Sequence, residues 1–200
     1  MPLHADLYLD QIDFRRHADM EICRICQVDS LEELLDRLRS GQLTGGRCPH
    51  WPRERVAAFR LALDAGQTLP VIPSLDIPRP IEPGVLDLNG ATAEAPALVT
   101  GNSGFTQEVL LAILSTTTAS MRLISVDTGG HTLDMSLVFE TLTPAAIARA
   151  LRAGDFAGRI ILPGLAEDLA APVSEILHRP IEVGPVCAAE LPLFFGALWV

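Results

Sequence analysis

Lysine is absent from this chain of 200 residues, so arginine supplies all of its fixed positive charge. The 25 acidic residues outnumber the 15 basic residues, and the formal net charge at pH 7 is -10. Proteins that bind a phosphate backbone or an anionic membrane need clustered lysine and arginine side chains. The composition therefore argues against a protein that binds nucleic acid or a charged membrane surface.

Long hydrophobic runs are also missing. No apolar run reaches the roughly 18 residues that a membrane-spanning helix needs. The first residues lack the basic-then-apolar order of a signal peptide, and we expect a cytoplasmic protein. In that compartment cysteines favour metal or redox chemistry over disulfides. The chain has four cysteines: Cys23, Cys26, Cys48 and Cys187.

The pattern of apolar residues predicts two folded blocks and a linker. Leucines from Leu31 to Leu38 recur at helical spacing, and Ser30 with Glu33 forms a capping-box sequence at the start of that helix. A second helix is predicted from about Arg53 to Ala65. Residues 67–96 hold six prolines, which exclude a long helix. We therefore expect a small helical domain at residues 1–66, a Pro-rich linker at 67–96 and a second domain at 97–200.

The second domain alternates strand and helix, which predicts an α/β fold with a mostly parallel sheet. The carboxyl ends of parallel strands meet at one edge of the sheet, where ligands bind. Turns of small residues follow the strands at this edge, and glycine there would let a flat ligand approach the backbone. Tight turns need Gly and Pro without any ligand, so the spacing alone leaves both readings open. The strands are predicted at 97–100, 122–126, 159–162 and 181–183, with a further one at 133–139.

Four segments of this domain resemble one known family in their order and spacing. Residues 97–102 resemble a V-T-x-N strand end, and residues 126–130 resemble a V-D-T-x-G turn. Residues 160–164 resemble L-I-I-P-G, and residues 183–192 resemble V-G-P-x-x-A-x-x-x-P. These segments are similar to the C-terminal domain in the large (gamma) subunit of the corrinoid iron–sulfur protein of the acetyl-CoA decarbonylase/synthase system. The corrinoid protein of mercury methylation shares the same blocks.

The resemblance implies a Rossmann-like domain that holds a corrinoid of the cobalamin type, with its nucleotide base detached from cobalt. In the mercury-methylation relative a cysteine that ligates cobalt stands where this chain has Met135. A lone methionine more often packs in a core, and His131 is the other candidate ligand. The implied pocket wall consists of Thr100, Asn102, Thr106, Asp127, Thr128, Gly130, Met135, Pro163, Gly184 and Pro185.

The cysteines of the first block carry a second resemblance. Cys23, Cys26 and Cys48 match three positions of the four-cysteine [4Fe–4S] module at the N terminus of the same large subunit. The third cysteine position holds Leu31, so one expected ligand is missing. Three outcomes stay open: a [4Fe–4S] cluster with one differentiated iron, a lost cluster with bare thiols, or a zinc site. A fourth ligand could come from Asp29, His50 or Cys187.

The resemblance implies a cofactor-carrying protein more than a stand-alone enzyme. It would carry a methyl group or act as a redox partner. The family's TIM barrel has no counterpart here, because residues 67–96 are too short for it. We therefore expect a protein partner: a methyltransferase, a TIM-barrel corrinoid-protein subunit or a reductase. Two alternatives remain, namely a non-catalytic accessory or assembly protein that lacks one or both cofactors, and an enzyme that binds another flat cofactor at the same edge.

Overall fold

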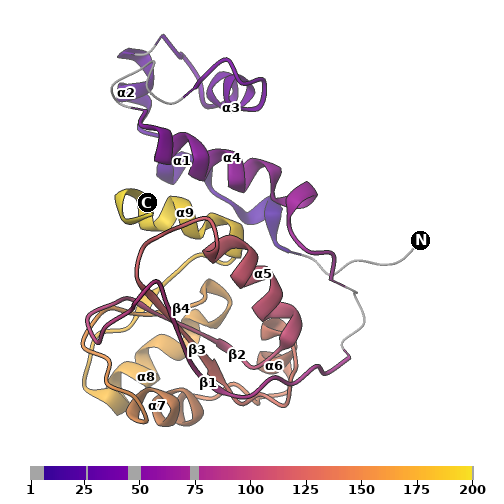
Figure 1. Cartoon of the computed structure of the whole chain (residues 1–200), viewed down its shortest axis with the longest axis vertical. Coiled ribbons are helices and arrows are strands. Elements are labelled where there is room, and N and C mark those ends of the chain that lie inside the picture. The colour runs from indigo at the N-terminus through magenta and orange to yellow at the C-terminus, as the bar shows by residue number, and fades with distance from the viewer. Residues whose placement is uncertain (1–6, 26, 45–50, 73–76, 200) are drawn as a thin grey trace. The chain divides into compact units, whose positions relative to one another are not determined.

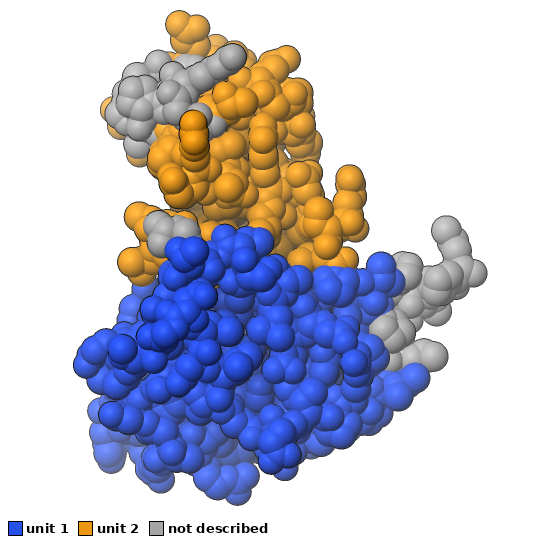
Figure 2. Space-filling model, in the orientation of Figure 1, with its two compact units in different colours: residues 1–6, 70–186 blue, residues 7–69, 187–200 orange. Residues whose placement is uncertain are grey.

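A computed structural model describes residues 7–25, 27–44, 51–72 and 77–199 (Figure 1). The chain divides into two compact units (Figure 2). Unit 1 contains Pro70–Val186, and unit 2 contains Leu7–Leu69 together with Cys187–Val200. Within the described ranges, no helix has the length and apolar character required to cross a membrane.

Unit 1 is built on a five-stranded sheet, which confirms the predicted α/β class. The strand order is β1-β3-β2-β4-β5; β1 runs antiparallel to β3, and the other neighbours are parallel. The central strands are buried except at Arg122 of β3, which is half-buried, as near-continuous apolar runs in a parallel sheet predict. The strands are β1 (Gly84–Leu88), β2 (Ala97–Gly101), β3 (Met121–Val126), β4 (Ile160–Leu162) and β5 (Glu182–Val183).

Helices lie on both faces of this sheet. Ile147 of α7 and Val173 of α8 share one apolar cluster with Val99 and Leu162 of the sheet. The chain runs from β2 to β3 in one direction across the sheet and from β3 to β4 in the other. Right-handed connections therefore place α5 on the face opposite to α7 and α8. The helices of unit 1 are α5 (Gly104–Leu114), α6 (Leu133–Val138), α7 (Pro144–Arg152) and α8 (Ala170–Leu177), with the 3-10 helix η2 (Gly164–Leu169).

The reversal of direction marks the place where a ligand is expected. The parallel strands follow the order of a doubly wound sheet whose switch point lies between β2 and β4. Ligands of such sheets bind in the crevice outside the carboxyl ends of the strands at that point. The segments that resemble the corrinoid family follow these carboxyl ends.

The prediction of a strand at residues 133–139 is wrong, because this segment forms helix α6. Leu133 and Leu137 are four residues apart, so they lie on one helical face, and both pack against the cluster of α7 and α8. Ser136 is buried, and its hydroxyl donates to the Leu133 carbonyl at 2.7 Å. The apolar residues of this segment therefore form a short helix that buries one side.

Two segments lie differently from the domain boundaries expected from the sequence. Gly84–Leu88, within the Pro-rich stretch, is strand β1 and pairs with β3 along its whole length. The last residues of the chain group with the N-terminal helices, because Cys187, Ala189 and Leu193 share the apolar cluster of unit 2. A hydrogen bond of 2.7 Å between His17 Nε2 and Glu190 Oε1 joins the same two segments.

Unit 2 is helical, and its helix starts follow the sequence signals. The Ser30 hydroxyl accepts from the Glu33 amide at 3.1 Å. The Glu33 carboxylate accepts from the Asp29 amide and from Arg37, and these bonds lower the pKa of Glu33. The elements are η1 (Leu9–Gln11), α1 (Phe14–His17), α2 (Met20–Ile25), α3 (Leu31–Arg39), α4 (Arg53–Thr68), η3 (Ala188–Glu190), α9 (Leu191–Phe195) and η4 (Gly196–Leu198).

Candidate functional site

Asn102, directly after β2, is the centre of a hydrogen-bond network at the carboxyl edge of the sheet. Its Oδ1 accepts from the Thr128 amide at 2.8 Å, the Thr128 hydroxyl at 3.1 Å and the Gly130 amide at 3.1 Å. Its Nδ2 donates to the Ile81 carbonyl at 2.9 Å. Asn102 and Thr128 are both buried, with 2% and 1% of their surfaces exposed. The side chain of Asn102 therefore holds the turn that follows β3, residues 127–130, in place through bonds within the protein. We call this turn the β3 turn.

The β3 turn has the form that its sequence suggests. Asp127 is exposed, and its Oδ1 accepts from the Gly129 amide at 3.1 Å. Gly129 and Gly130 both have positive φ angles, of 70° and 84°, which favour glycine. Thr128 points into the protein while Asp127 faces solvent, so the turn presents one carboxylate at this edge.

A second pair of predicted residues meets at β4 and β5. The Gly164 amide donates to the Pro185 carbonyl at 2.9 Å, and the Gly184 amide donates to the Leu162 carbonyl at 2.7 Å. Pro163, Gly184 and Pro185 are half-buried. The structure thus joins the third and fourth family-like segments to each other, as it joins the first and second through Asn102.

The glycines at this edge pack against the protein's own backbone. A Cβ at Gly130 would lie 2.3 Å from the Pro80 nitrogen, and a Cβ at Gly164 would lie 2.7 Å from the Val186 nitrogen. A Cβ at Gly129 would have no neighbour closer than 3.8 Å. Gly130 and Gly164 therefore allow two segments of the same protein to pack closely. The presence of glycine at these positions needs no ligand to explain it.

Two hydroxyl groups at the end of β2 are buried. Thr100 Oγ1 and Ser103 Oγ have no hydrogen-bond partner among the described residues, and Thr100 and Ser103 are 3% and 0% exposed. An unpaired buried hydroxyl carries a free-energy cost unless a ligand or water meets it. The packing of the protein at this edge does not explain why these two buried hydroxyls have no partner among the described residues.

The remaining predicted residues lie on helices near the same edge. Thr106 is in the first turn of α5 and Met135 is in α6, and both are half-buried. The His131 ring lies 4.8 Å from the Phe139 ring, centroid to centroid. The His131 carbonyl approaches the end of β2, since a Cβ at Gly101 would lie 3.6 Å from it.

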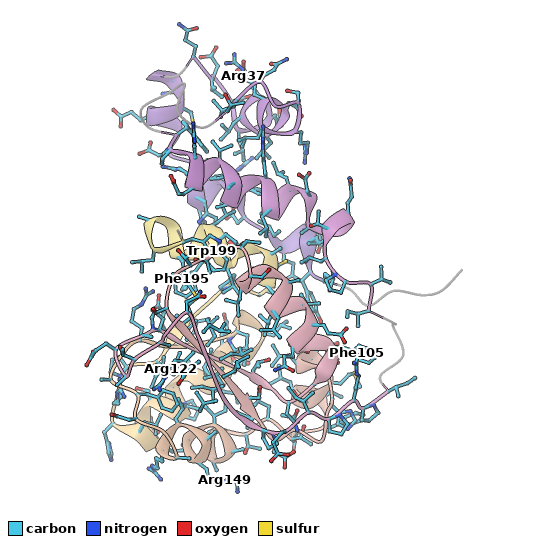
Figure 3. All side chains as sticks on the ribbon, viewed as in Figure 1. Arg37, Phe105, Arg122, Arg149, Phe195 and Trp199 are labelled. Carbon is cyan, nitrogen blue, oxygen red and sulfur yellow. The ribbon has the colours of Figure 1, made fainter. Side chains whose placement is uncertain are left out.

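The sequence did not indicate the segment that covers Asn102. Residues 79–81, which we call the strap, lie across residues 102–104 and Gly130, and Pro80 forms a β-bridge with Ser103. The Arg79 side chain pairs with Glu108 of α5 at 2.6 Å and lies over the ring of Phe105, labelled in Figure 3. An irregular segment with alternating prolines has no periodicity, so no signal in the sequence predicted this position.

The predicted metal ligands fall mostly outside the described residues. Cys26 and Cys48 are not described, whereas Cys23 in α2 is fully buried in the apolar cluster of unit 2. Burial raises the pKa of the Cys23 thiol, which favours the neutral form over the thiolate that binds metals. In the part of the chain that the structure describes, no group of three or more His, Cys, Asp or Glu side chains could hold a metal ion.

No protein-family model matches this chain. Among curated proteins, subunit gamma of the acetyl-CoA decarbonylase/synthase complex from Methanopyrus kandleri is 25% identical to it over 122 residues. The chain is a distant homologue of that subunit. The match covers 58% of this chain and 26% of the relative, so the chain spans about a quarter of the relative's length. This relationship confirms the resemblance seen in the sequence motifs.

Proposed function

We propose that this chain is a corrinoid-binding protein that carries a methyl group or presents a cobalt centre to a protein partner. The observation that carries the proposal is the distant homology to the gamma subunit over 122 residues. The meeting of all four family-like segments at the carboxyl ends of the strands supports it, because this is where a doubly wound sheet binds ligands.

The groups at this edge suit a corrinoid. A corrin ring is a large, flat macrocycle with amide groups around its rim, and neutral hydroxyls can pair with amides. Thr100, whose hydroxyl has no partner among the described residues, and the half-buried Thr106 offer such groups. When bound, a corrinoid would supply cobalt as the group that accepts and donates a methyl group. The protein would supply position, with Asn102 holding the turn of Asp127, Thr128 and Gly130; Met135 stands at the sequence position where the mercury-methylation relative has its cobalt ligand.

The name of the relative bears on the partner. The gamma subunit belongs by its name to a complex. We infer that a methyltransferase, a TIM-barrel subunit or a reductase is the protein partner of this chain. The chain itself is then a carrier of the cofactor, and the chemistry is completed in the complex.

The cysteines of the first block do not form a complete set of iron–sulfur ligands. Cys23, Cys26 and Cys48 match three cluster positions, but Leu31 occupies the third position, so one cysteine ligand is missing. We therefore assign no electron-transfer step to these cysteines. The missing ligand favours a second candidate, an accessory or assembly protein that kept the fold and lost one or both cofactors.

Anaerobic purification separates the two candidates. We expect the purified protein to show corrinoid absorption bands in the visible range and to contain cobalt by metal analysis, with iron and zinc measured alongside. A colourless, metal-free protein that takes up no added cobalamin would contradict the proposal and support the accessory protein.

A further inference from the structure

The strap at residues 79–81 is held by four hydrogen bonds. The Arg79 amide donates to the Gly130 carbonyl at 3.0 Å, and the Arg79 carbonyl accepts from the Gly104 amide at 2.8 Å. The Ile81 amide donates to the Asn102 carbonyl at 2.9 Å, and the Ile81 carbonyl accepts from Asn102 Nδ2 at 2.9 Å. The strap is therefore bonded on both sides, to the end of β2 and to the β3 turn.

The strap covers the amino end of α5. Ser103 and Gly104, the first residues of this helix terminus, are buried, and the Gly104 amide is used by Arg79. A Cβ at Gly104 would lie 3.1 Å from the Arg79 side chain. The amino end of a helix after the first parallel strand is the usual place where such sheets bind a phosphate. Here the protein's own backbone takes that place.

Opening the strap would leave several buried groups without partners. The Gly104 amide, the Asn102 carbonyl and the Gly130 carbonyl each lose a bond when the strap departs, and Asn102 Nδ2 keeps only its 3.5 Å contact with Asp127 Oδ1. A buried donor or acceptor without a partner is costly. The Arg79–Glu108 ion pair adds a contact on the α5 side. The strap therefore stays closed unless a ligand replaces these bonds.

We infer that the strap is a specificity element, latched by Asn102, which closes the amino end of α5 to phosphate groups and confines any ligand to the crevice between β2 and β4. In this role Asn102 is a positioning residue, because its side chain holds the strap and the turn. The inference rests on the proposed function for the ligand's identity, but the state of the strap can be measured without any ligand.

Amide hydrogen exchange of the wild-type protein tests the closed strap directly. We expect the amides of Arg79, Ile81 and Gly104 to exchange at least about tenfold more slowly than in an unfolded peptide, as bonded amides do. Inorganic pyrophosphate at millimolar concentration should leave the exchange of Gly104, Phe105 and Thr106 unchanged. Unprotected amides, or protection of these three by pyrophosphate in the wild type, would overturn the inference.

Two glycine variants provide a matched pair. Gly130→Ala and Gly129→Ala both place a side chain at a positive φ angle, but only Gly130→Ala drives a Cβ into Pro80. We expect Gly130→Ala to speed the exchange of the Arg79, Ile81 and Gly104 amides by about tenfold or more, while Gly129→Ala leaves them protected. Equal exchange of these amides in the two variants would show that Pro80 does not close on Gly130.

A third variant covers the case in which Gly130→Ala does not fold. Asn102→Leu has a side chain of similar size and removes the donor to the Ile81 carbonyl and the acceptor of the Thr128 and Gly130 amides, so it should speed the exchange of the Thr128 and Gly130 amides. Unchanged protection of these two amides in the folded variant would overturn the role of Asn102. Loss of cobalamin binding with an intact strap would count against the proposed function alone, because the exchange pattern does not depend on the ligand.

Discussion

At the scale of single residues, polar atoms at the end of β2 fall into two classes. Thr128 Oγ1 donates to Asn102 at 3.1 Å, whereas Thr100 Oγ1 has no partner among the described residues. A hydrogen bond stabilises the folded protein, and an unpaired buried hydroxyl destabilises it. The hydroxyl of Thr128 stabilises the fold. The hydroxyl of Thr100 is left for a ligand to pair with.

This difference predicts opposite effects of one substitution at two sites. Thr128→Val should lower the free energy of unfolding by about 0.5–1.5 kcal/mol through the lost hydrogen bond. Thr100→Val should leave it unchanged or raise it, because no bond is lost. Urea denaturation of both variants measures the two values. Equal losses in both would show that Thr100 has a partner in the folded protein without ligand.

Cys23 and Cys187 form a second matched pair, since both are buried thiols in the apolar cluster of unit 2. If residues 23–48 hold an iron–sulfur cluster, Cys23→Ala should reduce the iron bound after anaerobic reconstitution, and Cys187→Ala should not. Each variant loses a similar buried side chain, so a difference reports on metal binding. The same iron content in wild type and Cys23→Ala would show that Cys23 does not hold an iron–sulfur cluster.

At the scale of elements, the capping signal at Ser30 correctly placed the start of α3, and the structure shows a second cap of the same kind. Ser30 caps α3 and Thr143 caps α7, each through its hydroxyl and an amide three residues later. Substitution of a serine cap by alanine costs about 0.5–2 kcal/mol. Ser30→Ala should therefore lower the free energy of unfolding by that amount. Ser40→Ala, at the exposed end of the same helix, is the control and should change it little; a similar loss in both variants would contradict the cap.

The elements also show where prediction from the sequence stopped. The strands β2, β3 and β4 are near-continuous apolar runs with clear turns, so their positions could be predicted. Helix α6 could not, because Leu133, Met135 and Leu137 alternate as in a strand while one helical face packs against the core. The strap was missed for a different reason: its position depends on backbone bonds to Asn102 and Gly130, which are distant in sequence.

At the scale of the whole molecule, the chain combines a sheet unit with a helical unit of different character. The sheet unit carries the first three segments that resemble the corrinoid family and residues 183–186 of the fourth, whereas the helical unit buries Cys23 in an apolar cluster. The switch point of the sheet, where such folds bind ligands, lies in unit 1. We therefore expect corrinoid binding to be a property of unit 1.

Titration of cofactor-free protein with cob(II)alamin, followed by visible absorption, tests the central claim most directly. We predict saturable binding of about one equivalent per chain, since ligand sites are few per protein. The spectrum should shift to that of cobalamin with its nucleotide base detached from cobalt, as the family resemblance implies. Thr100→Val should weaken this binding without loss of folding stability. A spectrum that the protein leaves unchanged at all ratios, with no cobalamin retained after gel filtration, would contradict the claim.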